Sequence, residues 1–376
     1  MIERAALGTG TALFNARSGA IVTTDALGAA VVSQLESGVD PVEVAPALAA
    51  AYGVEPSRRA APLRTVVDAL IAQWSEAGLL ARDRLEYPDP VADHGKPLRQ
   101  KAEYYTRFGS FQVACETKLL ADQLNEILGV VSDARQRRSE SQRSLRCVSC
   151  SGGGFGVFSG KAIWGRATLD EARFLIIREA AEVLCGAGRV GAVMHGSAVS
   201  NGDGALLIMG DSGRGKSTLA QGLVAAGCGY VSDDHLPLHV GGRSVLSFPT
   251  RSAVKPRAMR LSEIKRLARR YGATSRARDG VTYLSIPAAA GVGEEIPVKA
   301  LVFPQYANGA SLGLTELTPQ EAFSESIAAG ARPTREDPQI GPLARLCGEV
   351  PAFRLDFGAS TQSVPACLEI LEDCRT

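Results

Sequence analysis

A run of nine residues combines the glycines, the lysine and the hydroxyls that a phosphate-binding turn requires. The run consists of Gly210, Asp211, Ser212, Gly213, Arg214, Gly215, Lys216, Ser217 and Thr218. It matches the P-loop pattern G-x-x-x-x-G-K-[ST], in which backbone N–H groups surround phosphate oxygens. Lys216 would reach the β- and γ-phosphates, and the Ser217 hydroxyl would ligate Mg²⁺. We interpret the run as a nucleotide-phosphate site.

An accidental match in a glycine-rich chain is the alternative, and the flanking sequence argues against it. Ala205–Met209 is a short apolar run, typical of a buried parallel strand that enters a turn. Leu219, Leu223 and Val224 then share one face of a helix, and Gly227 stands at its C-cap.

A pair of aspartates follows the next predicted strand. The segment 228–231 is a short apolar run that leads into Asp233 and Asp234 at the same edge of the sheet. A carboxylate there can hold Mg²⁺ or accept the proton of an attacking hydroxyl. A polar loop or helix cap is the alternative. No N-K-x-D element follows, so a GTPase has no support.

A histidine ends the strand before the P-loop. Val190–Met194 reads as a buried strand, and His195 with Gly196 follows directly. A lone histidine in this position is more often structural than functional. Further on, Arg251 and Lys255 place two cations where the active edge of the sheet should continue, and either could neutralise charge on a transferred phosphoryl group. A basic surface loop is the alternative.

Together, His195-Gly196, the P-loop and the acidic pair resemble the HPr kinase/phosphorylase family of serine kinases in order and spacing. The resemblance implies a P-loop α/β fold like the nucleotide-binding half of PEP carboxykinase, with ATP and Mg²⁺ as ligands. It implies that Asp233 is the base, that Asp234 assists at the acceptor or metal, and that His195 contacts phosphate. Ser217 and Asp233 would hold the Mg²⁺.

The chain departs from that family in two places. Thr218 stands where the family usually has glutamate. The broader group of HPr kinase-related proteins has threonine at this position, as this chain does. The Glu- and Arg-containing signature that follows the acidic pair in true HPr kinases is also missing. The pattern therefore does not identify the phosphocarrier protein HPr as substrate, nor a reverse phosphorylase activity.

The first 85 residues predict a hairpin followed by three helices. Segments 12–14 and 20–23 are strand-like around a turn, and helices are expected from Asp25, Pro41 and Pro62 onward. This order resembles the PqqD-like family, which binds leader peptides of ribosomally made, modified peptides. The resemblance implies that residues of about 11–85 bind a precursor peptide, with the leader added as a strand beside the hairpin. A small structural or regulatory domain is the alternative.

Composition limits the other functions. The 376-residue chain has a formal net charge of +1, which gives no electrostatic case for nucleic acid or an anionic membrane. No signal peptide or membrane span is recognisable, so a cytoplasmic location is expected. Eight cysteines are scattered, and Cys147 and Cys150 form a lone C-x-x-C without the further ligands that zinc needs.

We therefore predict a two-domain α/β protein. Residues 1–88 would form an α+β, winged-helix-like peptide-recognition domain, 89–100 a linker, and 101–376 a P-loop kinase domain. The leading hypothesis is an ATP-dependent kinase that phosphorylates a Ser or Thr hydroxyl of a ribosomal precursor peptide. A small-molecule or phosphocarrier-protein kinase and an ATP-gated peptide chaperone are the alternatives. Assembly into a homo-oligomer is left open.

Overall fold

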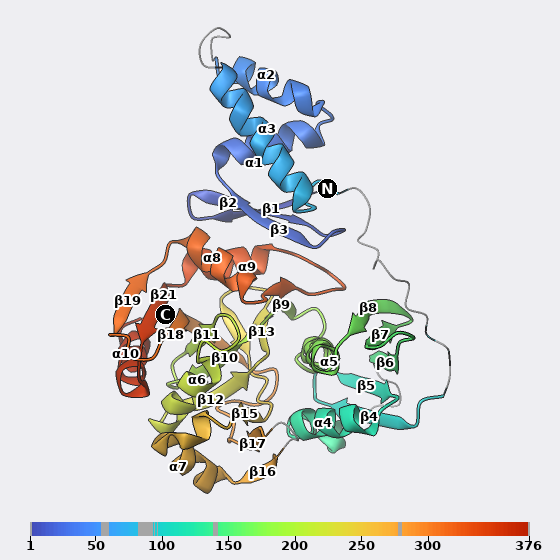
Figure 1. Cartoon of the computed structure of the whole chain (residues 1–376), viewed down its shortest axis with the longest axis vertical. Helices are drawn as coiled ribbons and strands as arrows, with labels where there is room; N and C mark the ends of the chain where they lie inside the picture. The colour runs from blue at the N-terminus through green and yellow to red at the C-terminus, as the bar shows by residue number, and fades with distance from the viewer. Residues whose placement is uncertain are drawn as a thin grey trace.

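The computed structural model describes residues 2–53, 60–81, 93, 95, 97–137, 142–276 and 280–374. These residues form an N-terminal unit, a five-stranded sheet with two helices, and a ten-stranded mixed sheet with helices on both faces (Figure 1). The predicted α/β class is confirmed, whereas the winged-helix-like form of the first unit stays a prediction. Within the described ranges, none of the helices is both long enough and apolar enough to cross a bilayer.

The N-terminal unit is a three-stranded antiparallel sheet followed by three helices. Its elements are β1 (Glu3–Leu7), β2 (Gly10–Asn15), β3 (Ala20–Thr24), α1 (Ala26–Glu36), α2 (Pro41–Ala51) and α3 (Ala60–Glu76). Asp25 caps α1 by accepting a hydrogen bond from the N–H of Gly28, and Asp40 caps α2 just before Pro41. The predicted hairpin and three helices are confirmed, and β1 is an additional strand.

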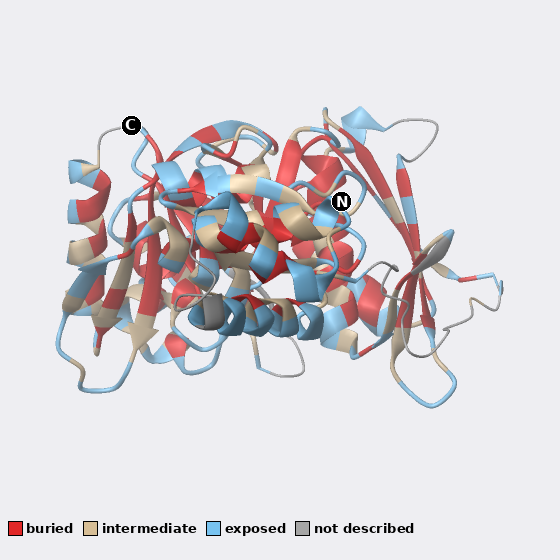
Figure 2. Cartoon of the chain, turned by 90° about the horizontal axis from the view of Figure 1, so that it is seen from above, coloured by how far each residue is buried: buried red, intermediate tan, exposed pale blue. Residues whose placement is uncertain are grey.

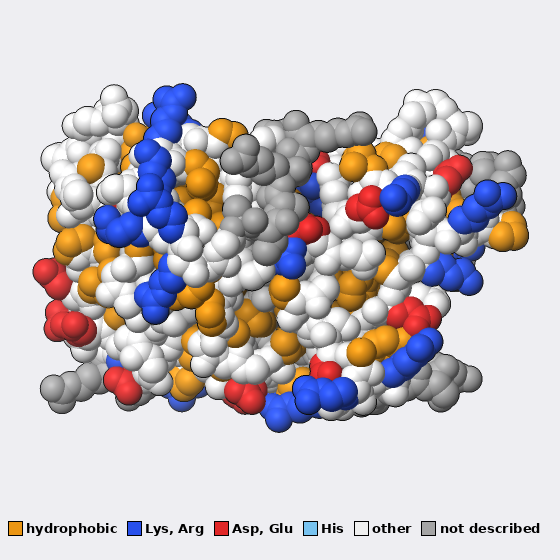
Figure 3. Space-filling view, turned by 90° about the horizontal axis from the view of Figure 1, so that it is seen from below, with side chains coloured by type: hydrophobic (Ala, Val, Ile, Leu, Met, Phe, Trp, Pro, Cys, Tyr) orange, Lys and Arg blue, Asp and Glu red, His pale blue; other side chains and the backbone are white. Residues whose placement is uncertain are grey.

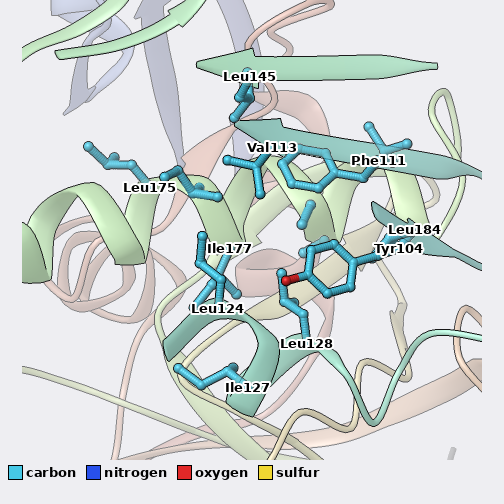
Figure 4. Packing of buried hydrophobic residues seen from close by; sticks show 14 of the residues in the cluster. Tyr104, Phe111, Val113, Leu124, Ile127, Leu128, Leu145, Leu175, Ile177 and Leu184 are labelled. Atoms are coloured by element: carbon cyan, nitrogen blue, oxygen red, sulfur yellow. The ribbon is translucent and has the colours of Figure 1, made fainter. Parts of the chain in front are cut away.

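The five-stranded sheet has the strand order β4-β5-β6-β7-β8. Its elements are β4 (Gln100–Tyr105), β5 (Ser110–Cys115), α4 (Lys118–Leu128), the short helix η1 (Ala134–Gln136), β6 (Arg143–Ser149), β7 (Phe155–Ser159), β8 (Lys161–Ala167) and α5 (Leu169–Leu184). Figure 4 shows Tyr104 and Phe111 of the sheet packed with Leu128 of α4 and Ile177 of α5. The helices therefore cover one face of this sheet with an apolar core.

The large sheet has the strand order β12-β10-β11-β18-β14-β13-β9-β20, with β21 beside β18 and β19 beside β21. Its strands are β9 (Val190–Met194), β10 (Gly196–Ser200), β11 (Ala205–Met209), β12 (Gly229–Asp233), β13 (Leu236–His239), β14 (Ser244–Leu246), β18 (Glu295–Tyr306), β19 (Gly313–Glu316), β20 (Arg332–Pro333) and β21 (Ala352–Phe357).

Five helices and a small three-stranded sheet surround the large sheet. The helices are α6 (Lys216–Ala225), α7 (Ser262–Tyr271), α8 (Pro319–Ala328), α9 (Gly341–Glu349) and α10 (Ser360–Asp373), with the short helix η2 (Ala258–Arg260) before α7. The small sheet consists of β15 (Ser252–Val254), β16 (Ala273–Arg276) and β17 (Thr282–Leu284).

Neighbouring residues of β11 fill the cores on the two faces of the large sheet. Leu206 and Ile208 belong to the core beneath α6, α7 and α10, whereas Leu207 and Met209 belong to the core beneath α8 and α9. Figure 2 shows the buried strands between helices whose outer surfaces are exposed. A strand covered on both faces reads as a continuous apolar run, which is why the sequence predicts β11 correctly.

The N-terminal unit is packed onto the large-sheet unit. Leu13 of β2 lies in the core of its own three helices, but the next residue, Phe14, shares a core with Phe323 of α8 and Leu343 of α9. Successive side chains of a strand point to opposite faces. The N-terminal sheet β1-β2-β3 is therefore enclosed between its own helices and those of the larger unit, as Figure 1 shows.

A carboxylate of β1 caps a helix near the other end of the chain. Glu3 accepts hydrogen bonds from the backbone N–H groups of Ile340, at 2.9 Å, and Gly341, at 3.2 Å, where α9 begins. A negative charge at a helix N-terminus satisfies free N–H groups and opposes the helix dipole favourably. Half of the predicted linker lies outside the described residues. Among the described residues, these hydrogen bonds and the shared core around Phe14 join the two units.

Candidate active site

Three strand ends bring the predicted site residues together. Strand β10 pairs antiparallel with both β11 and β12, which places Gly196 opposite Met209 and Ser197 opposite Asp233. The carboxyl ends of β11 and β12 and the start of β10 therefore meet at one edge of the sheet. The P-loop, the acidic pair and His195 all lie there, as the topological rule for ligand sites in open α/β sheets leads one to expect.

The P-loop has the backbone conformation that its glycines allow. Gly210, Gly213 and Gly215 have φ values of 141°, 88° and 96°, which side-chain-bearing residues rarely adopt. Residues 211–214, between the first and last glycines of the loop, are exposed to solvent. Within the described chain, no side chain caps the start of α6. The first N–H groups of this helix, on residues 216–218, are therefore available to phosphate oxygens.

Lys216 is held inside the loop. It is only 6% exposed, and its Nζ donates hydrogen bonds to the carbonyl oxygens of Gly210, at 2.7 Å, and Asp211, at 3.0 Å. Burial lowers the pKa of Lys216, and the carboxylates of Asp234 and Asp233 act in the opposite direction. The ammonium group therefore lies between the loop and the acidic pair.

Asp233 is the centre of a buried hydrogen-bond network. Its Oδ1 accepts from the hydroxyls of Ser197, at 2.7 Å, and Ser217, at 2.9 Å, and its Oδ2 accepts from Ser252, at 2.9 Å. Gln221 of α6 donates to the Ser252 oxygen at 2.9 Å and orients that hydroxyl. The contact with Ser217 joins the end of β12 directly to the P-loop.

The network does not fully offset the cost of burying the Asp233 charge. The side chain is 2% exposed, and burial, followed by the repulsion of Asp234, raises the pKa of Asp233 to about 6. The hydrogen bonds from the three serine hydroxyls lower the pKa and limit this rise. Asp233 is therefore ionised at pH 7 but remains a stronger base than an ordinary aspartate.

Asp234 has an unusual backbone conformation. Its φ of 66° lies in the left-handed region, which costs a non-glycine residue energy and is common at functional sites. The side chain is half-buried. Its carboxylate acts electrostatically on both Lys216 and His195, so its charge lies in the same site.

His195 is bound to the backbone of Asp234. Its Nδ1 lies 3.0 Å from the Asp234 carbonyl oxygen. Because a carbonyl only accepts, Nδ1 carries the proton and Nε2 presents a lone pair. Burial and the charge of Lys216 lower the pKa of His195, so the ring is neutral at pH 7. The predicted contact with phosphate thus requires the ring to gain a second proton.

A second histidine, His235, contacts the Phe174 ring that also contacts His195. It was not among the residues predicted from the sequence. His235 is 3% exposed, donates through Nε2 to the carbonyl of Phe174 at 3.0 Å, and has its pKa lowered to about 4, chiefly by burial. The Phe174 ring lies 4.4 Å from the His235 ring and 5.3 Å from that of His195. His235 follows the acidic pair directly, so its position in the sequence was the available signal.

The two candidate cations differ in their contacts. Arg251 forms an ion pair with Glu126 of α4, so its charge is paired with the five-stranded unit. Lys255 is exposed, and its charge lowers the pKa of both His195 and Lys216, so it lies near the site. Of the two, Lys255 is placed to meet phosphate charge.

Basic side chains also gather on the outer face near α7. Lys265, Arg266, Arg269 and Arg270 of this helix are exposed. Figure 3 shows Lys and Arg side chains in a stripe on the lower face of the molecule, where α7 lies. These side chains therefore form a solvated basic surface.

The available oxygen atoms fit Mg²⁺. Among the described residues, no group of three His, Cys, Asp or Glu side chains could enclose a metal ion. Mg²⁺ does not need such a cage, because it is usually held by one or two protein oxygens together with water and substrate phosphates. The Ser217 Oγ and Asp233 Oδ1 atoms, 2.9 Å apart beside the P-loop, are oxygens of this kind.

Comparison with known proteins identifies the N-terminal unit. Residues 10–80 match the family model for coenzyme PQQ synthesis protein D (PqqD). Among solved structures, the Hpr(Ser) kinase/phosphatase from Coxiella burnetii is similar, with 12% sequence identity and a TM-score of 0.23 over 48% of this chain and 93% of that chain. No curated protein matches the chain. The PqqD-like part of the resemblance noted in the sequence thus has a counterpart in these comparisons.

The fold and the site thus define a P-loop α/β protein. Its N-terminal PqqD domain is packed on α8 and α9 of the unit that carries the P-loop.

Proposed function

We propose that this protein is an ATP- and Mg²⁺-dependent kinase that phosphorylates a Ser or Thr hydroxyl of a ribosomally made precursor peptide bound by its N-terminal domain. The observation that carries the proposal is the hydrogen bond from the P-loop hydroxyl of Ser217 to Asp233, with Lys216 beside it. P-loop enzymes that transfer or hydrolyse the γ-phosphoryl group join a loop hydroxyl and a carboxylate in this way.

The phosphate chain of ATP would lie across the P-loop. The N–H groups at the start of α6 would donate to its oxygens, and Lys216 would exchange a loop carbonyl for a β- or γ-phosphate oxygen. Ser217 and Asp233 would hold the Mg²⁺, whose positive charge offsets that of the transferred group. Lys255 would add a second positive charge from the facing loop.

Asp233 would remove the proton from the acceptor hydroxyl. The alcohol oxygen then bonds to the γ-phosphorus while the bond from that phosphorus to the bridging oxygen of ADP breaks, and the proton remains on the carboxylate. Oδ2 of Asp233 accepts only the Ser252 hydrogen bond within the described chain and keeps a second lone pair for this proton. The raised pKa of Asp233 favours the transfer. Asp234 would orient the acceptor beside it.

The N-terminal unit offers a place for the peptide. A cleft of about 1150 Å³ lies between β1, the end of α1 and the end of α3. Its apolar lining includes Leu35, Val39, Ile71 and Leu80. Within the described residues, β1 pairs only with β2, so its outer edge can accept an added strand. Because the unit is packed on α8 and α9, a peptide held there would keep a fixed relation to the kinase site.

Incubation with ATP, Mg²⁺ and synthetic peptides encoded by short reading frames beside the gene tests the proposal. Intact-mass measurement should find one added phosphate on a Ser or Thr, and Asp233→Asn should abolish the addition. Asp203→Asn is the matched control, because Asp203 is exposed in the turn before β11. If Asp233→Asn transfers phosphate as fast as the control variant, the assignment of the base is wrong.

The same experiment separates the alternatives. A small-molecule kinase would leave every peptide unmodified, and an Ile71→Glu change in the cleft would not affect its activity. An ATP-gated chaperone would release free phosphate in the presence of peptide without modifying it. Deletion of the N-terminal domain is less informative, because it would expose the apolar core shared by Phe14 and Leu343.

A further inference from the structure

Two aromatic residues lie at the carboxyl ends of the strands on the far side of the P-loop. Strands β11, β18 and β21 are parallel neighbours, so their carboxyl ends share one edge of the sheet. Tyr306 ends β18, Phe357 ends β21, and the two residues are register partners. The edge that carries the P-loop thus continues directly into an aromatic pair.

The aromatic pair touches the P-loop itself. A Cβ atom on Gly215 would lie 3.4 Å from Phe357 Cζ and 3.6 Å from Tyr306 Cβ. The two rings form an edge contact, with their centroids 5.6 Å apart and an interplanar angle of 60°. Phe357 is 5% exposed, whereas Tyr306 is half-buried. Phe357 therefore braces Tyr306 from within, and the Tyr306 ring stands next to the loop at the surface.

A cation lies over the Tyr306 ring. The guanidinium of Arg257, an exposed residue just before η2, is 5.9 Å from the ring centroid. This distance is at the outer limit of a cation–π contact. A planar group that entered beside Tyr306 would meet an aromatic face on one side and a guanidinium plane close by, two surfaces on which nucleic acid bases stack.

The order of the strands sets the direction of a bound nucleotide. Asp233 ends β12 on one side of β11, and Tyr306 ends β18 on the other. Adjacent strands are about 4.8 Å apart, so the ends of β12 and β18 are separated by roughly 14 Å. A triphosphate whose terminal group lies at Asp233 and whose chain follows the P-loop would carry its nucleoside toward Tyr306.

We propose that Tyr306, braced by Phe357 and accompanied by Arg257, is the stacking platform for the base of the nucleotide. The inference rests on the proposed use of a nucleoside triphosphate. A Cβ atom at Gly215 would be in van der Waals contact with the platform, so the P-loop and the two rings are immediate neighbours. Stacking recognises the aromatic face that all bases share, so the platform would contribute affinity more than selectivity between bases.

Calorimetric titration of the full-length protein with ATP and with inorganic tripolyphosphate, each with Mg²⁺, tests the platform. Tyr306→Ala should weaken ATP binding roughly ten- to a hundredfold and leave tripolyphosphate binding unchanged, which also shows that the P-loop is intact. Tyr306→Phe keeps the ring and should bind ATP nearly as well as the wild type. Tyr52→Ala, at a tyrosine that is 64% exposed in the N-terminal unit, is the control.

The outcomes separate this inference from the proposed function. If Tyr306→Ala binds ATP like the wild type, or loses both ligands equally, the platform is refuted while the kinase proposal stands. If wild-type protein binds ATP no better than tripolyphosphate, the base has no platform, although the phosphate site remains. If wild-type protein binds neither ligand, the proposed function fails and the platform with it.

Discussion

The hydroxyl of Ser217, the second residue of α6, donates a 2.9 Å hydrogen bond to Oδ1 of Asp233, the last residue of β12. This bond connects the P-loop to a buried carboxylate whose pKa is raised to about 6. The two residues are 16 positions apart in the chain and come from neighbouring parts of one sheet edge. The proposed chemistry of the site depends on this bond.

Ser217→Ala should abolish most of the phosphoryl transfer. The change removes both a proposed Mg²⁺ ligand and a hydrogen bond to Asp233, and loss of one well-placed electrostatic contact in a transition state costs roughly a hundredfold or more in rate. Ser217→Thr keeps the hydroxyl and should retain activity with a changed dependence on Mg²⁺ concentration. Steady-state rates measured across a Mg²⁺ titration check this. Equal rates for Ser217→Ala and the wild type would remove Ser217 from the site.

Asp233→Asn should stabilise the fold at neutral pH although it inactivates the site. The pKa of Asp233 rises from 3.8 to about 6 on folding, and a difference of one in pKa corresponds to about 1.4 kcal/mol, so the buried charge costs roughly 3 kcal/mol. The cost is absent below pH 3.8, grows as the pH rises to about 6, and is complete above that. Asparagine carries no such charge at any pH.

Denaturant unfolding at pH 5 and pH 7.5 measures this effect. The free energy of unfolding of Asp233→Asn should exceed that of the wild type by roughly 1 to 3 kcal/mol at pH 7.5, and the difference should shrink at pH 5. Asp203→Asn should show no pH-dependent difference. A destabilised Asp233→Asn at pH 7.5 would mean that the serine hydroxyls bind the carboxylate strongly enough to offset its burial.

The edge of the large sheet shows which parts of the candidate site can be predicted from the sequence. The P-loop pattern and its apolar strand specify local structure, so the sequence alone predicts that Lys216 and Asp233 lie at this edge. Ser197 and Ser252 were missed, because each reaches Asp233 only through tertiary folding, from 36 and 19 residues away. A serine has no pattern of its own that would mark it as a carboxylate partner.

The N-terminal strand was missed for a different reason. Glu3–Leu7 is composed of Glu, Arg, Ala and Leu, all of which favour helices. Pairing with β2 and the contact of Glu3 with the start of α9 override this preference. The packing of the PqqD domain on the large-sheet unit joins residues 337 positions apart, and no local sequence pattern predicts it.

Glu3→Ala should therefore destabilise the whole chain rather than release a free domain. Loss of a helix cap costs about 1 kcal/mol, and the shared core around Phe14 should keep the two units in one unfolding transition. Thermal unfolding followed by circular dichroism and calorimetry measures both quantities. Arg4→Ala is the neighbouring control, because Arg4 pairs with Glu36 at the surface and should matter less. Two separate transitions in the wild type would contradict the packed arrangement.

Ile71→Glu should weaken peptide binding selectively. Ile71 lines the cleft beside β1, and a carboxylate there would oppose burial of an apolar peptide side chain. Val66→Glu is the matched control, because Val66 is on the same helix and 46% exposed. Fluorescence anisotropy with a labelled leader segment should report a loss of affinity of at least roughly tenfold for Ile71→Glu alone. Equal effects of both changes would place the peptide elsewhere.

Nucleotide binding should raise the pKa of His195. The pKa is lowered in the free protein by burial and by Lys216, and the negative charge of a nearby triphosphate acts in the opposite direction. Imidazole NMR signals recorded across a pH titration, with and without a non-hydrolysable ATP analogue, measure the change. The signal of His239, at the far end of β13, is the internal reference. An unchanged His195 would remove it from contact with phosphate.

The most direct test of the central claim compares the ADP formed with the phosphate found on the precursor peptide in a single reaction. The account predicts that the two amounts are equal and that both disappear in Asp233→Asn but not in Asp203→Asn. ADP and free phosphate formed beside an unmodified peptide would contradict it, because the site would then activate water instead of the peptide hydroxyl.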